Sequence, residues 1–197
     1  MAEGWTWETL EGRCRECRRC SLCETRHHVV FGVGNRQAEI LLVGEGPGEN
    51  EDLQGVPFVG RAGQLLDAVL EATGFSRGHN VYIANMVKCR PPKNRDPLPE
   101  EQEACGEWLQ AQIELLRPKI LVCLGRVAAC SLLDPNFKVT REHGRFVEKD
   151  GRWIMGTFHP AAILRNPGQK AAWFADFVAL REFFPRVCEH TQSVYPE

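Results

Sequence analysis

Three short apolar runs are spaced along the chain between turn-forming residues, at positions 40–43, 81–87 and 120–124, and a fourth strand is expected over 152–157. Runs of this length, apolar at successive positions, are typical of strands that are buried on both faces of a sheet. Each of the first three is followed by a stretch of helical periodicity. Such alternation favours βαβ units. The sequence therefore predicts an α/β protein, a three-layer α/β/α sandwich around a central, mostly parallel sheet of four strands.

Apolar residues at helical spacing predict the helices that cover this sheet. One stripe follows the first strand and stops at Gly74. A second helix begins at Pro99 and ends before Pro118, where the helical conformation is disfavoured. Further helices are expected over 125–133 and 170–184.

The composition is that of an ordinary globular protein, since 43% of the 197 residues are hydrophobic and 25% are charged. We expect one domain over residues 1–184, with an amino-terminal segment at 1–38 and a polar, frayed tail at 185–197. No apolar run approaches the roughly 20 residues that span a bilayer, and the amino terminus resembles no signal peptide. The sequence therefore predicts a cytoplasmic protein with no membrane partner.

The net charge and the cysteine content restrict how the protein can bind DNA and which role its cysteines have. The formal net charge of −2 excludes DNA binding through a generally basic surface, so any such contact must come from local patches. Nine cysteines are an odd number. Because there is no export signal, they are expected to be metal ligands or buried thiols rather than a disulfide framework.

Ligands of parallel α/β sheets bind beyond the carboxyl ends of the strands, so the loops that follow the strands are the candidate sites. The first of these loops runs from Gly44 to Gly63 and is rich in glycine, which lets backbone N–H groups approach a ligand closely. It matches neither the P-loop nor the G-x-G-x-x-G pattern. Its acidic residues Glu45 and Glu51 would also repel a phosphate. A nucleotide-phosphate loop is therefore disfavoured.

Polar residues follow two further strands. Asn85 stands near the end of the second strand, where its amide offers both a donor and an acceptor to the edge of a planar heterocycle. His159 stands after the last strand and before Pro160, which holds it extended at the start of a short helix. Alone, each would be an ordinary structural hydrogen-bonding residue. Their occurrence after successive strands favours a binding site.

Three motifs, in this order, resemble those of the family 4 uracil-DNA glycosylases. They are Gly-Glu-Gly-Pro-Gly-x-x-Glu-Asp with Gly-x-Pro-Phe-Val-Gly-x-Ala-Gly-x-Leu-Leu-Asp, then Asn-x-Val-Lys-Cys-Arg-Pro-Pro, and then His-Pro-Ala-Ala-Ile-Leu-Arg-Asn-Pro. The resemblance covers residues 17–182. It implies an iron–sulfur enzyme of the bacterial or archaeal cytosol that flips uracil out of DNA and hydrolyses its N-glycosidic bond. The abasic product would enter base excision repair.

The resemblance also implies a uracil pocket, formed by Glu45, Gly46, Pro47, Phe58, Asn85 and His159. Phe58 would stack on the flipped base. Asn85 would read the O4 and N3–H edge, which cytosine does not match. A neutral His159 would donate to O2 and stabilise the leaving anion.

Hydrolysis also needs a group that orients water toward C1′, and a carboxylate is suited to this. Glu45 and Glu51 are both available, and the sequence leaves the role open between them; Glu51 could instead cap a helix or pair with an arginine. The expected catalytic residues are thus His159, Glu45 and Glu51.

DNA contacts are expected from the residues that follow the His-Pro element. Leu164 would fill the gap left by the flipped base, and Arg165 would contact phosphate or stack; alternatively, the helix simply packs its leucine. Basic residues of the amino-terminal segment and of loop 88–95 could add phosphate contacts.

The amino-terminal segment carries cysteines at every third position, namely Cys14, Cys17, Cys20 and Cys23. At about 100° per residue, the first and last of these would face opposite sides of a regular helix, so all four cannot hold one group from a helix.

The resemblance implies that Cys17, Cys20, Cys89 and Cys105 hold a 4Fe-4S cluster with a structural role. Four thiolates would also suit tetrahedral zinc. Cys14 and Cys23 depart from the family pattern, and are substitute ligands or free thiols. Cys123 and Cys130 are expected to be buried packing residues.

Two other functions remain as alternatives. A homologue that captures uracil covalently would carry a histidine in an Arg-rich insertion after the second strand, and loop 90–99 has no histidine. A non-enzymatic metal-cluster module that binds nucleic acid would use the same pocket for recognition only. The expected partner in the favoured case is uracil-containing DNA, bound by a monomer that hands its product to abasic-site repair enzymes.

Overall fold

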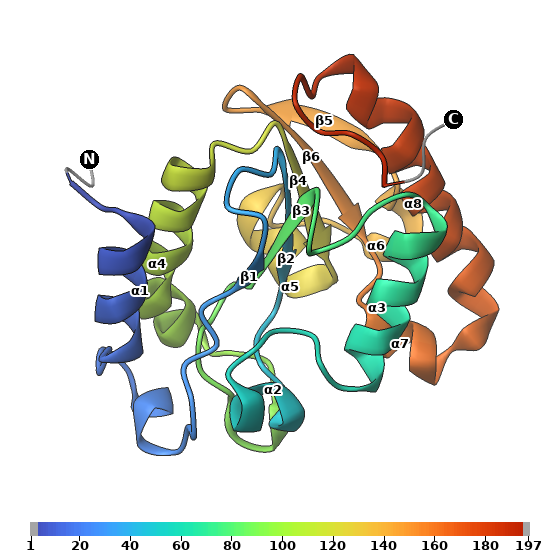
Figure 1. Ribbon diagram of the computed structural model, residues 1–197. Helices are drawn as coiled ribbons and strands as arrows, with labels where there is room; N and C mark the ends of the chain where they lie inside the picture. Colours follow the sequence, from blue (N-terminus) through green and yellow to red (C-terminus); the bar gives the residue numbers. More distant parts are fainter. Residues whose placement is uncertain (1–3, 195–197) are drawn as a thin grey trace.

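The computed structural model describes residues 4–194, which form one sheet with helices on both faces (Figure 1). The strands are β1 (Val33–Gly34), β2 (Ile40–Gly44), β3 (Val81–Asn85), β4 (Ile120–Leu124), β5 (Phe146–Lys149) and β6 (Arg152–Thr157). Their order is β1-β3-β2-β4-β6-β5. The pairs β3–β2, β2–β4 and β4–β6 are parallel, whereas β1 and β5 are antiparallel edge strands.

The expected four strands form the parallel centre of this sheet, but the count of four is wrong. β1 is only two residues long, and three of the four residues of β5 are exposed, so neither produces an apolar run. In contrast, every residue of β2, β3 and β4 is buried, as strands covered on both faces require.

The helices are α1 (Trp7–Arg15), α2 (Glu49–Gln54), α3 (Arg61–Ala72), α4 (Pro99–Leu116), α5 (Arg126–Leu132), α6 (Val139–Glu142), α7 (Pro160–Arg165) and α8 (Lys170–Phe183). Short 3-10 turns lie at Ser21–Glu24, Pro92–Asn94, Pro167–Gln169 and Phe184–Arg186. α3, α7 and α8 pack on one face of the sheet and α4 and α5 on the other, which confirms the three layers (Figure 1). Within residues 4–194, no helix has the length and apolar character needed to cross a bilayer.

A third apolar cluster lies outside the sandwich and holds the amino-terminal segment in place. Leu10 of α1 and Trp108 of α4 pack there with Val87, Cys89 and Cys105. α1 lies alongside α4 (Figure 1). The segment that carries the first four cysteines is thereby brought next to the loop that follows β3.

α2 was expected to be a loop, because it has no apolar stripe. Its one buried residue is Asp52, whose carboxylate accepts the backbone N–H of His27 at 2.9 Å and contacts His27 Nδ1 at 2.6 Å. A buried carboxylate needs such partners. The helix is thus held by the segment that follows the amino-terminal cysteines.

The end of the chain is anchored rather than frayed as far as residue 194. The Glu39 carboxylate accepts the backbone N–H groups of Glu189, His190 and Thr191 at 2.7–2.9 Å. The N–H of Val194 donates to Gly74 O at 3.0 Å. Residues 195–197 of the expected tail lie outside the described part of the chain.

Candidate functional site

A cavity of about 640 Å³ lies at the carboxyl ends of the four parallel strands. Each strand contributes to its lining through the residues that follow it or end it: Glu45 for β2, Asn85 for β3, Gly125 for β4 and His159 for β6. All six residues of the expected uracil pocket line this cavity, together with Glu51 and Arg165. Leu164 is not among the lining residues, and its side chain is 39% exposed on α7.

Phe58 and Asn85 meet at the end of β2 because that strand ends in a glycine. A Cβ on Gly44 would lie 2.4 Å from Asn85 Oδ1 and 2.6 Å from Phe58 Cζ. The Phe58 ring lies 5.6 Å, centroid to centroid, from the imidazole of His159. An aromatic face, an amide and an imidazole therefore share one wall of the cavity.

The backbone at Phe58 is held in a left-handed conformation, with φ of 54°. Such a conformation is unfavourable for a bulky residue unless the surroundings impose it. Arg77 donates to Pro57 O at 2.8 Å and to Phe58 O at 3.0 Å. Gly63 makes room on the other side, since a Cβ there would lie 1.9 Å from Phe58 O. Arg77 lies outside every motif of the sequence, so its role is evident only from these contacts.

Asn85 has an unusual feature for a buried amide. Asn85 is 1% exposed, and its Oδ1 has no hydrogen-bond partner within residues 4–194. An unpaired buried oxygen of this kind costs about 1–3 kcal/mol. Because Asn85 lines the cavity, a ligand N–H is the partner that would remove this cost.

His159 is held in one tautomer by the helix that it caps. The backbone N–H of Ala161 donates to His159 Nδ1 at 3.1 Å, so the single proton of a neutral ring resides on Nε2. Burial, with a contribution from Arg165, lowers the pKa of His159 from 6.5 to about 4. The ring is therefore a neutral N–H donor at neutral pH.

The two candidate carboxylates have different surroundings. Burial, with a contribution from Asp96, raises the pKa of Glu45 from 4.5 to about 7, and its carboxylate forms no hydrogen bond within the described residues. Glu51 Oε1 accepts the backbone N–H groups of Val59 and Gly60, both at 2.8 Å. Glu51 thus braces the turn between Phe58 and α3, which is a capping role of the kind the sequence allowed.

The loop after β4 was overlooked, because its Gly-Arg pair matches no motif. Gly125 adopts φ of 93°, and a Cβ there would lie 2.9 Å from His159 Cβ. Arg126 lines the cavity and pairs with Asp96 at 2.5 Å. The rule that ligands bind beyond strand ends was the signal that could have found both residues.

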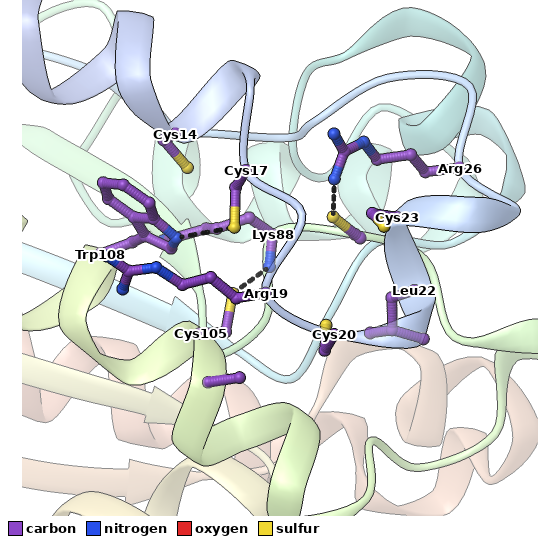
Figure 2. Close-up of a pocket in the computed structure, with 12 residues that line it drawn as sticks. Cys14, Cys17, Arg19, Cys20, Leu22, Cys23, Arg26, Lys88, Cys105 and Trp108 are labelled. Carbon is purple, nitrogen blue, oxygen red and sulfur yellow. Dashed lines mark hydrogen bonds between the residues drawn. The ribbon is translucent and has the colours of Figure 1, made fainter.

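Figure 2 shows a second, small cavity of about 10 Å³ between α1, α4 and the loop after β3. Its lining includes all six cysteines of these segments, namely Cys14, Cys17, Cys20, Cys23, Cys89 and Cys105. The four expected ligands are thus brought together, with Cys14 and Cys23 beside them. No three metal-binding side chains among residues 4–194 converge as the ligands of a single ion do.

Three N–H groups donate to sulfur in this cavity. Trp108 Nε1 donates to Cys17 Sγ at 3.4 Å, Arg26 Nη1 to Cys89 Sγ at 3.3 Å, and the backbone N–H of Lys88 to Cys105 Sγ at 3.2 Å (Figure 2). Donors of this kind stabilise a sulfur that carries negative charge.

The other cysteines are packed as thiols. Cys123 is fully buried in β4, as expected, and burial raises its pKa to about 12. Cys130 is only half-buried and lies against the cluster between the sheet, α4 and α5.

Several of the basic residues expected to contact phosphate are engaged elsewhere. Arg15 pairs with Glu11 at 2.6 Å, and Arg95 pairs with Glu101 at 2.6 Å. Lys88 is 1% exposed, so a phosphate contact from its side chain is excluded.

The comparisons with known proteins agree with the motifs. The model of the uracil-DNA glycosylase superfamily matches residues 31–180. A type-4 uracil-DNA glycosylase of Archaeoglobus fulgidus is 46% identical over 89% of this chain and 93% of its own length. The type-4 uracil-DNA glycosylase of Thermotoga maritima is 47% identical over 81% of this chain and 83% of its own length. That of Saccharolobus solfataricus is 42% identical over 89% of this chain and 85% of its own length. The chain therefore belongs to the uracil-DNA glycosylase superfamily, among its type-4 members.

Proposed function

We propose that this protein is an enzyme that flips uracil out of DNA and hydrolyses its N-glycosidic bond, leaving an abasic site for base excision repair. The observation that carries this proposal is the buried Oδ1 of Asn85, which has no hydrogen-bond partner within residues 4–194 and belongs to a residue that lines one cavity with Phe58 and His159. The names of the relatives support the same activity.

Base recognition follows from the unpaired amide. Asn85 Oδ1 accepts N3–H of uracil, and its amide NH₂ donates to O4. Cytosine presents an unprotonated N3 and an N4 amino group, so both contacts would be lost and the amide would stay unpaired. Stacking of the flipped base on Phe58 contributes about 1–3 kcal/mol, which offsets the few kcal/mol that extrusion from the duplex costs.

Departure of the base is assisted by His159. As the bond between C1′ and N1 breaks, its electron pair stays with uracil and negative charge spreads to O2. The Nε2–H of the neutral imidazole donates to that oxygen. A preorganised donor at such a position lowers the barrier by about 3 kcal/mol.

We assign the orientation of the attacking water to Glu45. Its carboxylate is unpaired, and a pKa of about 7 is suited to a general base at neutral pH. The water oxygen bonds to C1′ and its proton passes to Glu45. Glu51, with Oε1 committed to Val59 and Gly60, positions the turn that presents Phe58.

The exposed Leu164 is suited to fill the gap that the flipped nucleotide leaves in the duplex. Arg165, beside it on α7 and at the edge of the cavity, is suited to contact a phosphate.

For the cysteine cavity we propose a 4Fe-4S cluster held by Cys17, Cys20, Cys89 and Cys105. The donor set fits this group, because thiols surround one cavity and N–H groups donate to three of the sulfurs. The bound cluster would crosslink the amino-terminal segment to the loop after β3. Cys14 and Cys23 also line this cavity, and we propose them as substitute ligands.

We propose that the protein acts as a monomer. We also propose that the reaction takes place in the cytosol and that abasic-site repair enzymes act next.

The test is alkaline cleavage of a labelled oligonucleotide that contains one deoxyuridine, after incubation with protein of measured iron content. We expect cleavage at the uracil with wild type and much less with Asn85→Ala or His159→Ala. Intact DNA with wild-type protein that still retards the oligonucleotide in a gel would overturn the proposal in favour of a binding module.

A further inference from the structure

Lys88 is a fully buried lysine between the two cavities of the protein. The residue lines the cysteine cavity (Figure 2). Its Nζ donates to the backbone O of Asn85 at 2.9 Å and to Gln112 Oε1 at 2.6 Å. Its own backbone N–H donates to Cys105 Sγ, and its carbonyl accepts the N–H of Val30 at 2.8 Å.

The side chain of Lys88 lacks an acidic partner. Both of its acceptors are neutral amide oxygens, and no carboxylate of residues 4–194 lies within ion-pair distance of it. A buried ammonium without a counter-charge costs several kcal/mol. The groups around it that can carry negative charge are the sulfurs of Cys14, Cys89 and Cys105.

We propose that Lys88 is the counter-ion of the cysteine-ligated group and the positioning residue that connects this group to Asn85. The proposal rests on the proposed function, since it assumes the cluster in one cavity and uracil in the other. A 4Fe-4S core with four thiolates has a net negative charge. This charge would balance the Lys88 ammonium, which the two neutral amide oxygens do not do.

The connection to the uracil pocket runs through the last peptide of β3. Lys88 Nζ holds the carbonyl of Asn85, the residue whose side chain faces the cavity. Gln112, the second acceptor, donates its Nε2–H to Phe31 O at 2.9 Å. The amino-terminal segment, α4 and the end of β3 thus meet at one buried ammonium, and its loss should loosen Asn85 as well as the cysteine loop.

The test compares Lys88→Met with Arg26→Met in protein loaded with iron under anaerobic conditions. Methionine has a similar length and volume without the charge. The Arg26 variant is the matched control, because Arg26 donates to Cys89 Sγ but does not contact Asn85. Two quantities are measured: the rate of iron release to a chelator, and the affinity of the loaded protein for free uracil by calorimetry.

Both variants should release iron faster. Arg26→Met removes a hydrogen bond to Cys89 Sγ, and Lys88→Met removes the buried positive charge beside the thiolates, for which we expect roughly tenfold faster release. Lys88→Met alone should also bind uracil roughly tenfold more weakly. Iron release by Lys88→Met at the wild-type rate would overturn the counter-ion role, and unchanged uracil affinity would overturn the positioning role.

If Lys88→Met does not fold, as judged by circular dichroism, Lys88→Gln is measured in the same way and with the same criteria. Failure of wild type to excise uracil would count against the proposed function. The iron-release comparison needs no turnover, so it decides the counter-ion role separately.

Discussion

Replacement of His159 is expected to lower activity strongly, because the protonation state of its ring is fixed by the fold. The difference between a pKa of 6.5 and one of about 4 corresponds to roughly 3 kcal/mol in favour of the neutral ring. Because Ala161 N–H occupies Nδ1, that neutral ring donates from Nε2. The donor is thus fixed before substrate arrives, which is the condition under which such a group is most effective.

Two substitutions separate the donor from the helix cap. His159→Ala removes both, and should lower the rate of excision by about 10²–10³-fold and the stability by about 1 kcal/mol. His159→Asn keeps a side chain that caps the first turn of α7 but is too short to place a donor where Nε2 lies. It should retain the stability and lose the rate.

The assay is single-turnover excision from a deoxyuridine oligonucleotide, with thermal melting of each variant. Nitrogen NMR of labelled histidine gives the tautomer directly, and we expect neutral Nε2–H down to pH 5. An imidazole that protonates near pH 6.5, or variants within threefold of the wild-type rate, would refute this reasoning.

Four further substitutions test other parts of the site. Glu45→Gln should lower the excision rate by about 10²–10⁴-fold and abolish the increase of that rate as the pH rises through about 7. Glu51→Gln should keep the increase. An increase with pH that survives in Glu45→Gln contradicts the assignment of the general base to Glu45. Because the folded-state pKa is raised above 4.5, ionised Glu45 costs stability at high pH, so Glu45→Gln should melt higher than wild type at pH 8. Gly63→Ala places a Cβ 1.9 Å from Phe58 O, and should cost about 1–3 kcal/mol and weaken uracil binding, as seen in melting and calorimetry. Leu164→Ala should slow excision from duplex DNA but not from single strands, since only the duplex must be unstacked; an equal loss on both substrates argues against a wedge.

The central sheet and the pocket were predictable because their signals are local. Strands such as β2 and β4, buried at every position, produce apolar runs that differ from helical periodicity. Parallel strands then align their carboxyl ends at one edge, so residues that follow different strands, such as Asn85 and His159, must converge. The edge strands β1 and β5 were missed because one is too short, and the other too exposed, to leave such a run.

The sequence by itself thus determined the layers, the four parallel strands at the centre of the sheet, and side chains such as Phe58, Asn85 and His159 that line the cavity. Only the tertiary structure decided how those side chains differ in charge and role. Glu45 and Glu51 look alike in the sequence, yet Glu45 is half-buried with no hydrogen-bond partner among residues 4–194, whereas Glu51 accepts the backbone N–H groups of Val59 and Gly60. Lys88 looked like a surface charge and is fully buried. The protonation state, tautomer and ion pairing of a side chain depend on partners that folding brings from distant positions in the chain. The hydrophobic periodicity of the sequence does not identify those partners.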